Sequence, residues 1–112
     1  MSQACLIYAT VGDAAAAESI GRILVAERLA AAANFLPGLR SVYWWQGELR
    51  TGSEALLVLK TRADLAEVAV ARLTALHAYA CPGVVILPVL GGNPAYLDWI
   101  AAESRPAAAP TR

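Results

Sequence analysis

Charge is scarce in this chain. Charged residues make up 16% of its 112 residues, and nine basic side chains balance nine acidic ones. Because the formal net charge is zero and no segment concentrates lysine and arginine, the sequence lacks the positive field that binds a phosphate backbone or an anionic lipid surface. We therefore expect no nucleic-acid partner and no membrane-surface partner.

Long apolar runs are also missing. Although 58% of the residues are hydrophobic, no run reaches the roughly 18 apolar residues of a membrane helix. Residues 1–4 lack the charged and apolar segments of a secretory signal, so we expect a cytoplasmic protein. So much apolar sequence among so few charges predicts that part of the apolar surface is buried between subunits.

Cysteine and histidine are too few to form an obvious reactive centre. Cys5 and Cys81 are predicted to be free thiols at opposite ends of the sheet and small core hydrophobes, because the cytosol is reducing. His77 is the only histidine, and no serine stands in a G-x-S-x-G turn. A phosphate-binding G-x-x-x-x-G-K-[ST] loop is absent as well. We therefore assign no catalytic residue.

The strongest local pattern is a β-hairpin within residues 36–61. An aromatic arm over 39–45 leads to a turn at Gln46–Glu48, where Gly47 permits the reversal. The return arm contains a continuous apolar run at 55–59, which predicts a central strand covered on both faces. Because neighbouring side chains in a strand alternate, one face of the aromatic arm is expected in the core and the other at a subunit interface.

The other segments complete a mixed fold. In chain order, they predict a strand over 5–11, a helix from the N-cap Asp13 to about Ala33, a strand from Asn34 that Pro37 and Gly38 interrupt, a helix opened by the capping pattern Thr61–Asp64 and ending near His77, a strand over 84–90 and a helix from Asn93 to Ser104. This order predicts an α+β, ferredoxin-like split β-α-β sheet with an extended hairpin and a short C-terminal helix. Residues 1–104 form the single domain, and 105–112 are expected to be a disordered tail.

Two groups of polar residues have alternative interpretations. Glu54 and Lys60 lie six residues apart on one face of the return arm, where they form either a structural ion pair or part of a cleft with Tyr43 and Trp44. His77 either caps the last carbonyls of its helix or contributes, with Cys81, to a metal site.

Several motifs together resemble the CutA family of divalent-cation tolerance proteins. They include Leu36-Pro37-Gly38, Leu59-Lys60-Thr61, His77-x-Tyr79-x-x-Pro82 and Tyr96-Leu97-x-Trp99. The similarity runs over about residues 4–103. It implies a homotrimer of ferredoxin-like subunits, whose long hairpin strands extend across the interfaces, and a link to copper and other divalent metals.

The resemblance also implies where a metal would bind. Some family members bind copper through a cysteine late in the first strand and two adjacent histidines after the second helix. The matching positions here are Ala9, Leu76 and His77. We therefore expect no required cofactor, and only weak binding of a divalent metal such as copper at His77. The alternatives are a PII-like small-molecule sensor or an enzyme that uses an intersubunit cleft of Tyr43, Glu54 and Lys60.

Overall fold

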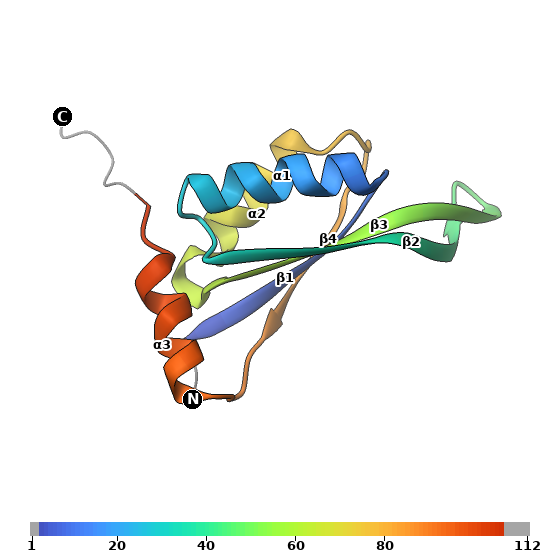
Figure 1. The fold of residues 1–112 in the computed structure, drawn as a ribbon. Coiled ribbons are helices and arrows are strands. Elements are labelled where there is room, and N and C mark those ends of the chain that lie inside the picture. The colour runs from blue at the N-terminus through green and yellow to red at the C-terminus, as the bar shows by residue number, and fades with distance from the viewer. Residues whose placement is uncertain (1–2, 107–112) are drawn as a thin grey trace.

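The computed structural model describes residues 3–106 as a four-stranded sheet with two helices on one face (Figure 1). The elements are β1 (Ala4–Val11), α1 (Ala14–Ala26), β2 (Ala32–Trp45), β3 (Glu48–Arg62), the 3₁₀ turn η1 (Ala63–Leu65), α2 (Ala66–Leu76), β4 (Gly83–Pro88) and α3 (Pro94–Glu103). The strand order β2-β3-β1-β4, with every pair antiparallel, confirms the ferredoxin-like prediction. Of the expected tail, 105 and 106 have no regular structure, and 107–112 lie outside the described residues.

The core lies between the sheet and the two helices α1 and α2. Along β1 and β3 every second side chain faces the helices, and the helices contribute apolar side chains of their own. Fully buried residues of this core are Ile7, Ala9, Leu24, Leu57, Leu59 and Leu73. Asp13 accepts a 2.8 Å hydrogen bond from the amide of Ala16 and so caps α1, as predicted. None of the helices in this part of the chain is long and apolar enough to cross a membrane.

The first helix ends seven residues earlier than predicted. After Ala26 the chain turns through Arg28, whose φ is 63°, and the amides of Arg28 and Leu29 donate to the carbonyls of Val25 and Leu24. This pair of hydrogen bonds is a Schellman C-cap. Alanine-rich sequence favours helix beyond residue 26, but the reversal lets Leu29, Ala30 and Ala31 be buried, and that packing prevails.

The predicted capping pattern at Thr61 is also wrong. Thr61 belongs to β3 and is fully buried, and α2 begins only at Ala66, after η1, with no side-chain cap. The Thr61 hydroxyl instead donates a 2.7 Å hydrogen bond to the carbonyl of Leu29. This contact joins the central strand to the turn that ends α1.

Thr61→Val is expected to lower the free energy of unfolding by about 1–3 kcal/mol, because valine keeps the volume but leaves a buried carbonyl without its donor. Denaturant unfolding at one fixed protein concentration measures the change. Thr74→Val on the exposed surface of α2 is the matched control, with an expected change within about 0.5 kcal/mol. Equal stability of the two variants would contradict the importance of this hydrogen bond.

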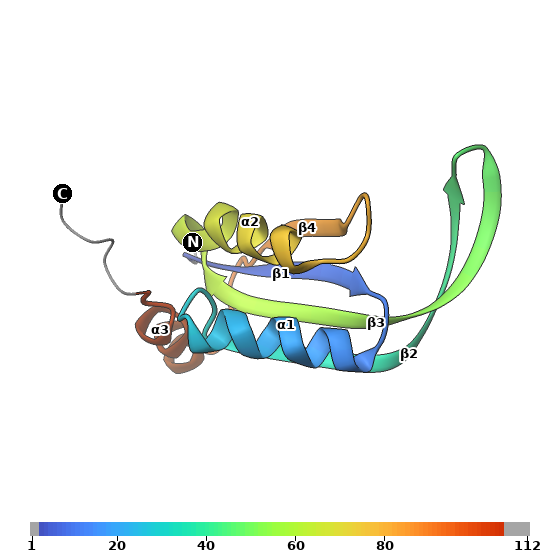
Figure 2. The same ribbon diagram turned by 90° about the horizontal axis from the view of Figure 1, so that it is seen from above.

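The hairpin is confirmed, with a turn of two residues. Gln46 and Gly47 have φ values of 50° and 79°, and Trp45 pairs directly with Glu48, which therefore lies in the strand. The register shifts between Leu36 and Leu39, as expected for a bulge at Pro37 and Gly38 on the edge strand β2. Beyond the bulge the hairpin extends past the helices and curves (Figure 2). Neither of its faces there packs in the chain's own core, so the expected core face is wrong.

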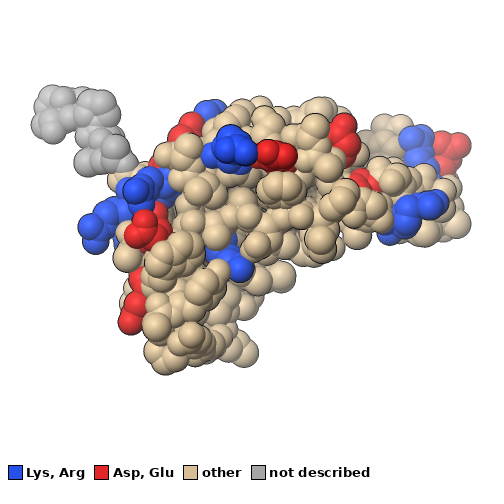
Figure 3. Space-filling view, in the orientation of Figure 1, with Lys and Arg blue, Asp and Glu red and all other residues tan. Residues whose placement is uncertain are grey.

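The face of the sheet opposite α1 and α2 is open and apolar. We call it the open face. Along β3 it includes Leu56 and Val58, which are only half-buried. The prediction that both faces of this strand are covered is therefore wrong within one chain. Exposed members of the open face include Tyr8 at 37%, Val85 at 53% and Leu36 at 64%. Helix α3 covers one end of it (Figure 1), and the surface beneath the sheet is nearly without charge (Figure 3).

Both cysteines are free, as predicted. Cys5 pairs with Pro88 in the sheet, whereas Cys81 precedes the opposite end of β4, so the two thiols lie far apart. Cys5 is buried, and this burial raises the pKa of its thiol. Cys81 is exposed, which corrects the expectation of a second core cysteine; the turn after α2 lies at the surface.

Candidate functional site

His77 connects the end of α2 to β1. The backbone becomes extended at this residue, with ψ at 140°, so the imidazole leaves the helix. Its Nε2 lies 2.7 Å from the carbonyl oxygen of Thr10, and its Nδ1 accepts a 3.2 Å hydrogen bond from the amide of Tyr79. Because a carbonyl can only accept, we assign the proton to Nε2. His77 does cap α2, because its backbone amide donates to the carbonyl of Thr74, but its imidazole bonds outside this helix.

The structure brings His77 beside the end of β1 but gives it no second ligand at the two family positions. Ala9 is fully buried on β1, and Leu76 packs against the core. No three metal-ligating side chains among residues 3–106 form a group that could hold an ion. A closed copper site does not fit these residues, because tight sites need several convergent donors. What the chain offers is one imidazole whose two nitrogens already form hydrogen bonds.

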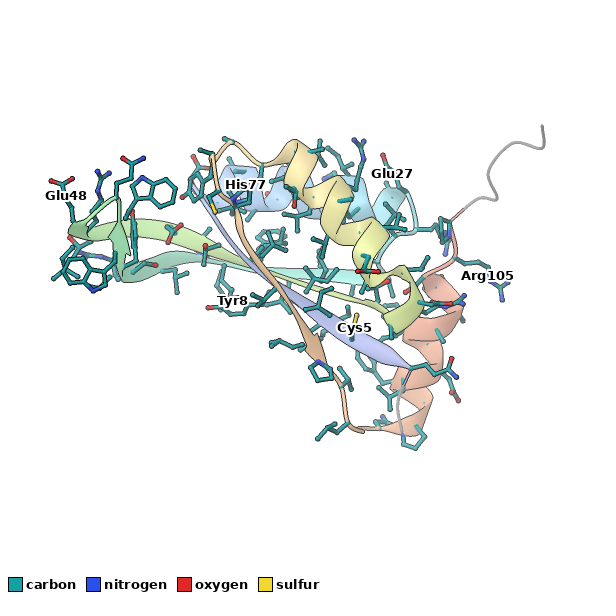
Figure 4. All side chains as sticks on the ribbon, turned by 180° about the vertical axis from the view of Figure 1, so that it is seen from behind. Cys5, Tyr8, Glu27, Glu48, His77 and Arg105 are labelled. Atoms are coloured by element: carbon teal, nitrogen blue, oxygen red, sulfur yellow. The ribbon has the colours of Figure 1, made fainter. Side chains whose placement is uncertain are left out.

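Tyr79 links His77 to β3. Its ring lies against the imidazole, with centroids 4.5 Å apart, and its hydroxyl donates a 2.9 Å hydrogen bond to Oε2 of Glu54. Partial burial, followed by the hydrogen bond and the charge of Glu54, raises the pKa of Tyr79 to about 12. The hydroxyl therefore remains a donor at neutral pH. Figure 4 shows this region, with His77 between the end of α2 and the sheet.

Beside Glu54 lies a cavity of about 520 Å³, which we call the hairpin cavity. It is bounded by the curved hairpin on one side and by the segment between α2 and β4 on the other (Figure 2). Its lining residues are Thr10, Ser41, Tyr43, Trp45, Arg50, Glu54, Tyr79, Ala80, Cys81 and Gly83. Aromatic rings, hydroxyl groups, one carboxylate and one guanidinium thus face a space large enough for a small organic molecule.

The structure brings together only part of the cleft expected from the sequence. Tyr43 and Glu54 line the hairpin cavity, whereas Trp44 belongs to the other face of the hairpin and is 72% exposed. Lys60 donates a 2.9 Å hydrogen bond to the hydroxyl of Tyr96, and its ammonium lies 5.2 Å from that ring's centroid. The expected Glu54–Lys60 ion pair is wrong, because six residues of strand separate the two by about 20 Å.

Several residues of the cavity were not predicted from the sequence. Tyr79 follows a helix in a segment without periodicity, and nothing local indicates that its hydroxyl reaches β3. Arg50 could have been found, because a two-residue turn fixes the register that places it opposite Tyr43. Trp45 lies on the same face of its strand as Tyr43, because alternate residues of a strand share a face.

Comparison with known proteins gives consistent matches. The family model described as CutA1 divalent ion tolerance protein matches residues 5–103. The divalent-cation tolerance protein CutA of Thermus thermophilus is 43% identical over 95 residues, which are 85% of this chain and 92% of that protein. The chloroplastic protein CutA 1 of Oryza sativa is 39% identical over 100 residues, or 89% of this chain, but the chain spans only 56% of its length.

Solved structures agree with the sequence matches. The crystal structure of CutA from Xylella fastidiosa superposes with a TM-score of 0.89 at 44% identity, covering 93% of this chain and all of that one. The divalent cation tolerance protein from Thermus thermophilus gives a TM-score of 0.86 at 41% identity, covering 89% and 97% of the two chains. The sequence and the fold therefore point to the same relatives.

Proposed function

Since the chain belongs to the CutA1 divalent ion tolerance protein family, we propose that it works as a homotrimeric, non-catalytic divalent-cation tolerance protein of the cytoplasm. The observation that supports this assembly is the apolar open face together with the exposed hairpin. Tyr8, Leu36, Trp44 and Val85 would be left in water by a solitary chain. Exposed apolar surface on this scale is typical of a subunit interface. The number of three copies comes from the family resemblance.

The proposed metal role rests on His77 alone. A divalent cation such as Cu²⁺ would take the lone pair of Nδ1, and the amide of Tyr79 would lose its acceptor. This lost hydrogen bond opposes binding, and Ala9 and Leu76 supply no further donor. The proposal is therefore weak binding, with no cation required for folding.

Calorimetric titration of the intact protein with Cu²⁺ tests this role. We expect affinity weaker than micromolar, which His77→Ala abolishes. Cys81→Ser, a change in the same segment, is the control and is expected to leave binding unchanged. Submicromolar affinity that survives His77→Ala would place the metal elsewhere, and a complete absence of binding would contradict the metal role altogether.

A second candidate function is a small-molecule sensor of the PII type. The hairpin cavity favours it, because this cavity combines aromatic walls with a few polar groups, as ligand sites do. The third candidate, an enzyme with a Tyr43, Glu54 and Lys60 cleft, has less support, since one chain holds Lys60 away from the other two.

A further inference from the structure

The hairpin cavity contains a carboxylate, Glu54, that forms no ion pair with the described residues. Two charged side chains line it, Arg50 and Glu54. Arg50 already pairs with Glu48 at 2.9 Å, whereas Glu54 belongs to none of the ion pairs formed within residues 3–106. The Tyr79 hydroxyl bonded to Glu54 is neutral and cancels no charge. A half-buried carboxylate without a counter-ion is unfavourable, so the cavity favours a positively charged occupant.

Aromatic rings extend this preference. Tyr43 and Trp45 from the hairpin and Tyr79 from the opposite wall line the same space. The face of an aromatic ring carries a negative quadrupole and attracts a cation, most strongly where water is displaced. The ring of Tyr79 lines the cavity, and its hydroxyl is bonded to Glu54. A carboxylate beside such rings matches an organic ammonium group better than it matches a neutral molecule.

The other lining groups define the kind of cation. A metal ion does not fit, because no three ligating side chains in the described part of the chain converge. A volume of about 520 Å³ lies within the range of small-molecule sites and admits an apolar body beside a charged head. The Ser41 hydroxyl and the second oxygen of Glu54 provide acceptors for the N–H groups of a primary ammonium.

We propose that the hairpin cavity binds a small primary organic ammonium ion, with Glu54 as its counter-ion and the rings of Tyr43, Trp45 and Tyr79 around its charge and apolar body. Tyr79 holds the carboxylate in place through its hydroxyl. This site differs from the proposed metal role, because it uses neither nitrogen of His77.

The first test compares two ligands of nearly equal shape on the assembled wild-type protein. Benzylamine and benzyl alcohol are titrated by calorimetry in the presence of EDTA, which removes any contribution from a divalent metal. We expect benzylamine to bind at least 10-fold more tightly than benzyl alcohol, because only the amine carries the charge that Glu54 and the rings recognise. This comparison needs no variant and therefore cannot fail through misfolding.

Variants then locate the site. Glu54→Gln keeps the shape and the acceptor for Tyr79 while removing the charge, and it should weaken benzylamine binding at least 10-fold. Trp45→Leu should weaken it about 3-fold, since an apolar side chain remains but the ring does not. Glu67→Gln removes the same charge from the exposed surface of α2 and is the matched control, with binding expected within 2-fold of wild type. Circular dichroism and assembled mass establish that each variant is folded.

Several results would overturn the proposal. Equal affinities for benzylamine and benzyl alcohol would remove the role of charge, and full affinity in folded Glu54→Gln would remove the role of this carboxylate. No binding of benzylamine to wild type would mean that the cavity is closed or filled in the assembly, for example by a side chain of another copy. The proposed copper role would stand in each case, because its measurement is made with Cu²⁺ and His77→Ala.

Discussion

A Tyr8→Asp variant is expected to sediment as a single chain at micromolar concentration, where we propose that the wild type is a trimer. Tyr8 lies on β1 in the open face and is 37% exposed in one chain. If other copies cover this face, the aspartate would be buried among largely apolar groups, at a cost of several kcal/mol for each ion. The Lys60 ammonium on the same face already donates a hydrogen bond to Tyr96. Symmetry repeats this cost in every subunit, so the assembly should dissociate.

Val68→Asp provides the matched control. Val68 is also an exposed apolar residue, at 55%, but it lies on α2, on the helix side of the molecule. An aspartate there remains in water, and sedimentation should give the wild-type mass. A Tyr8→Asp protein that assembles like wild type would show that the open face is not an interface.

Leu57→Ala is expected to lower the free energy of unfolding by about 2–5 kcal/mol, because it removes three carbons from a packed core and leaves a cavity. Leu57 is fully buried on the central strand β3, in the layer that faces α1 and α2. Such a loss is a large part of the roughly 5–15 kcal/mol that holds a domain folded. Denaturant unfolding at fixed protein concentration measures it, since the stability of an assembly depends on concentration.

The control for this change is Leu90→Ala. Leu90 follows β4 and is 83% exposed, so truncating it should alter stability by no more than about 0.5 kcal/mol. If Leu57→Ala cost as little as Leu90→Ala, the assignment of the core to the helix side of the sheet would be wrong.

Local patterns were sufficient to predict the sheet but not how it is covered. Alternating side chains, the glycine at Gly47 and the Pro37–Gly38 bulge gave the hairpin, and the order of elements gave the topology. The run at 55–59 predicts a strand with two buried faces. One chain packs α1 and α2 against one of these faces, whereas α3 covers only one end of the other. A sequence pattern indicates that a face of a strand is apolar, but it does not indicate whether a helix of the same chain or another copy covers that face.

The errors at the end of α1 and at Thr61 have one physical origin. Helix ends are usually recognised by glycine, and here Arg28 adopts the left-handed conformation instead. The cost is offset by burial of Leu29 and by the hydrogen bond from Thr61 to its carbonyl. That contact joins residues 32 positions apart in the sequence, so no local pattern could reveal it.

The candidate site was predicted in part for the same reason. Glu54 was recognised as a charged residue in an apolar arm and Tyr43 as a member of a possible cleft with it, and both line the cavity. Tyr79 was missed as a site residue, because its role depends on a hydrogen bond to a strand 25 residues away. The family resemblance placed Tyr79 in a motif, and the structure supplies the contact.

Sedimentation equilibrium of the wild-type protein across nanomolar to micromolar concentrations tests one claim about the assembly. This claim is that the open face and the hairpin are covered by other copies of the same chain. We expect the mass of three chains throughout the micromolar range, without a stable folded monomer. A folded protein with the mass of one chain at micromolar concentration would contradict it.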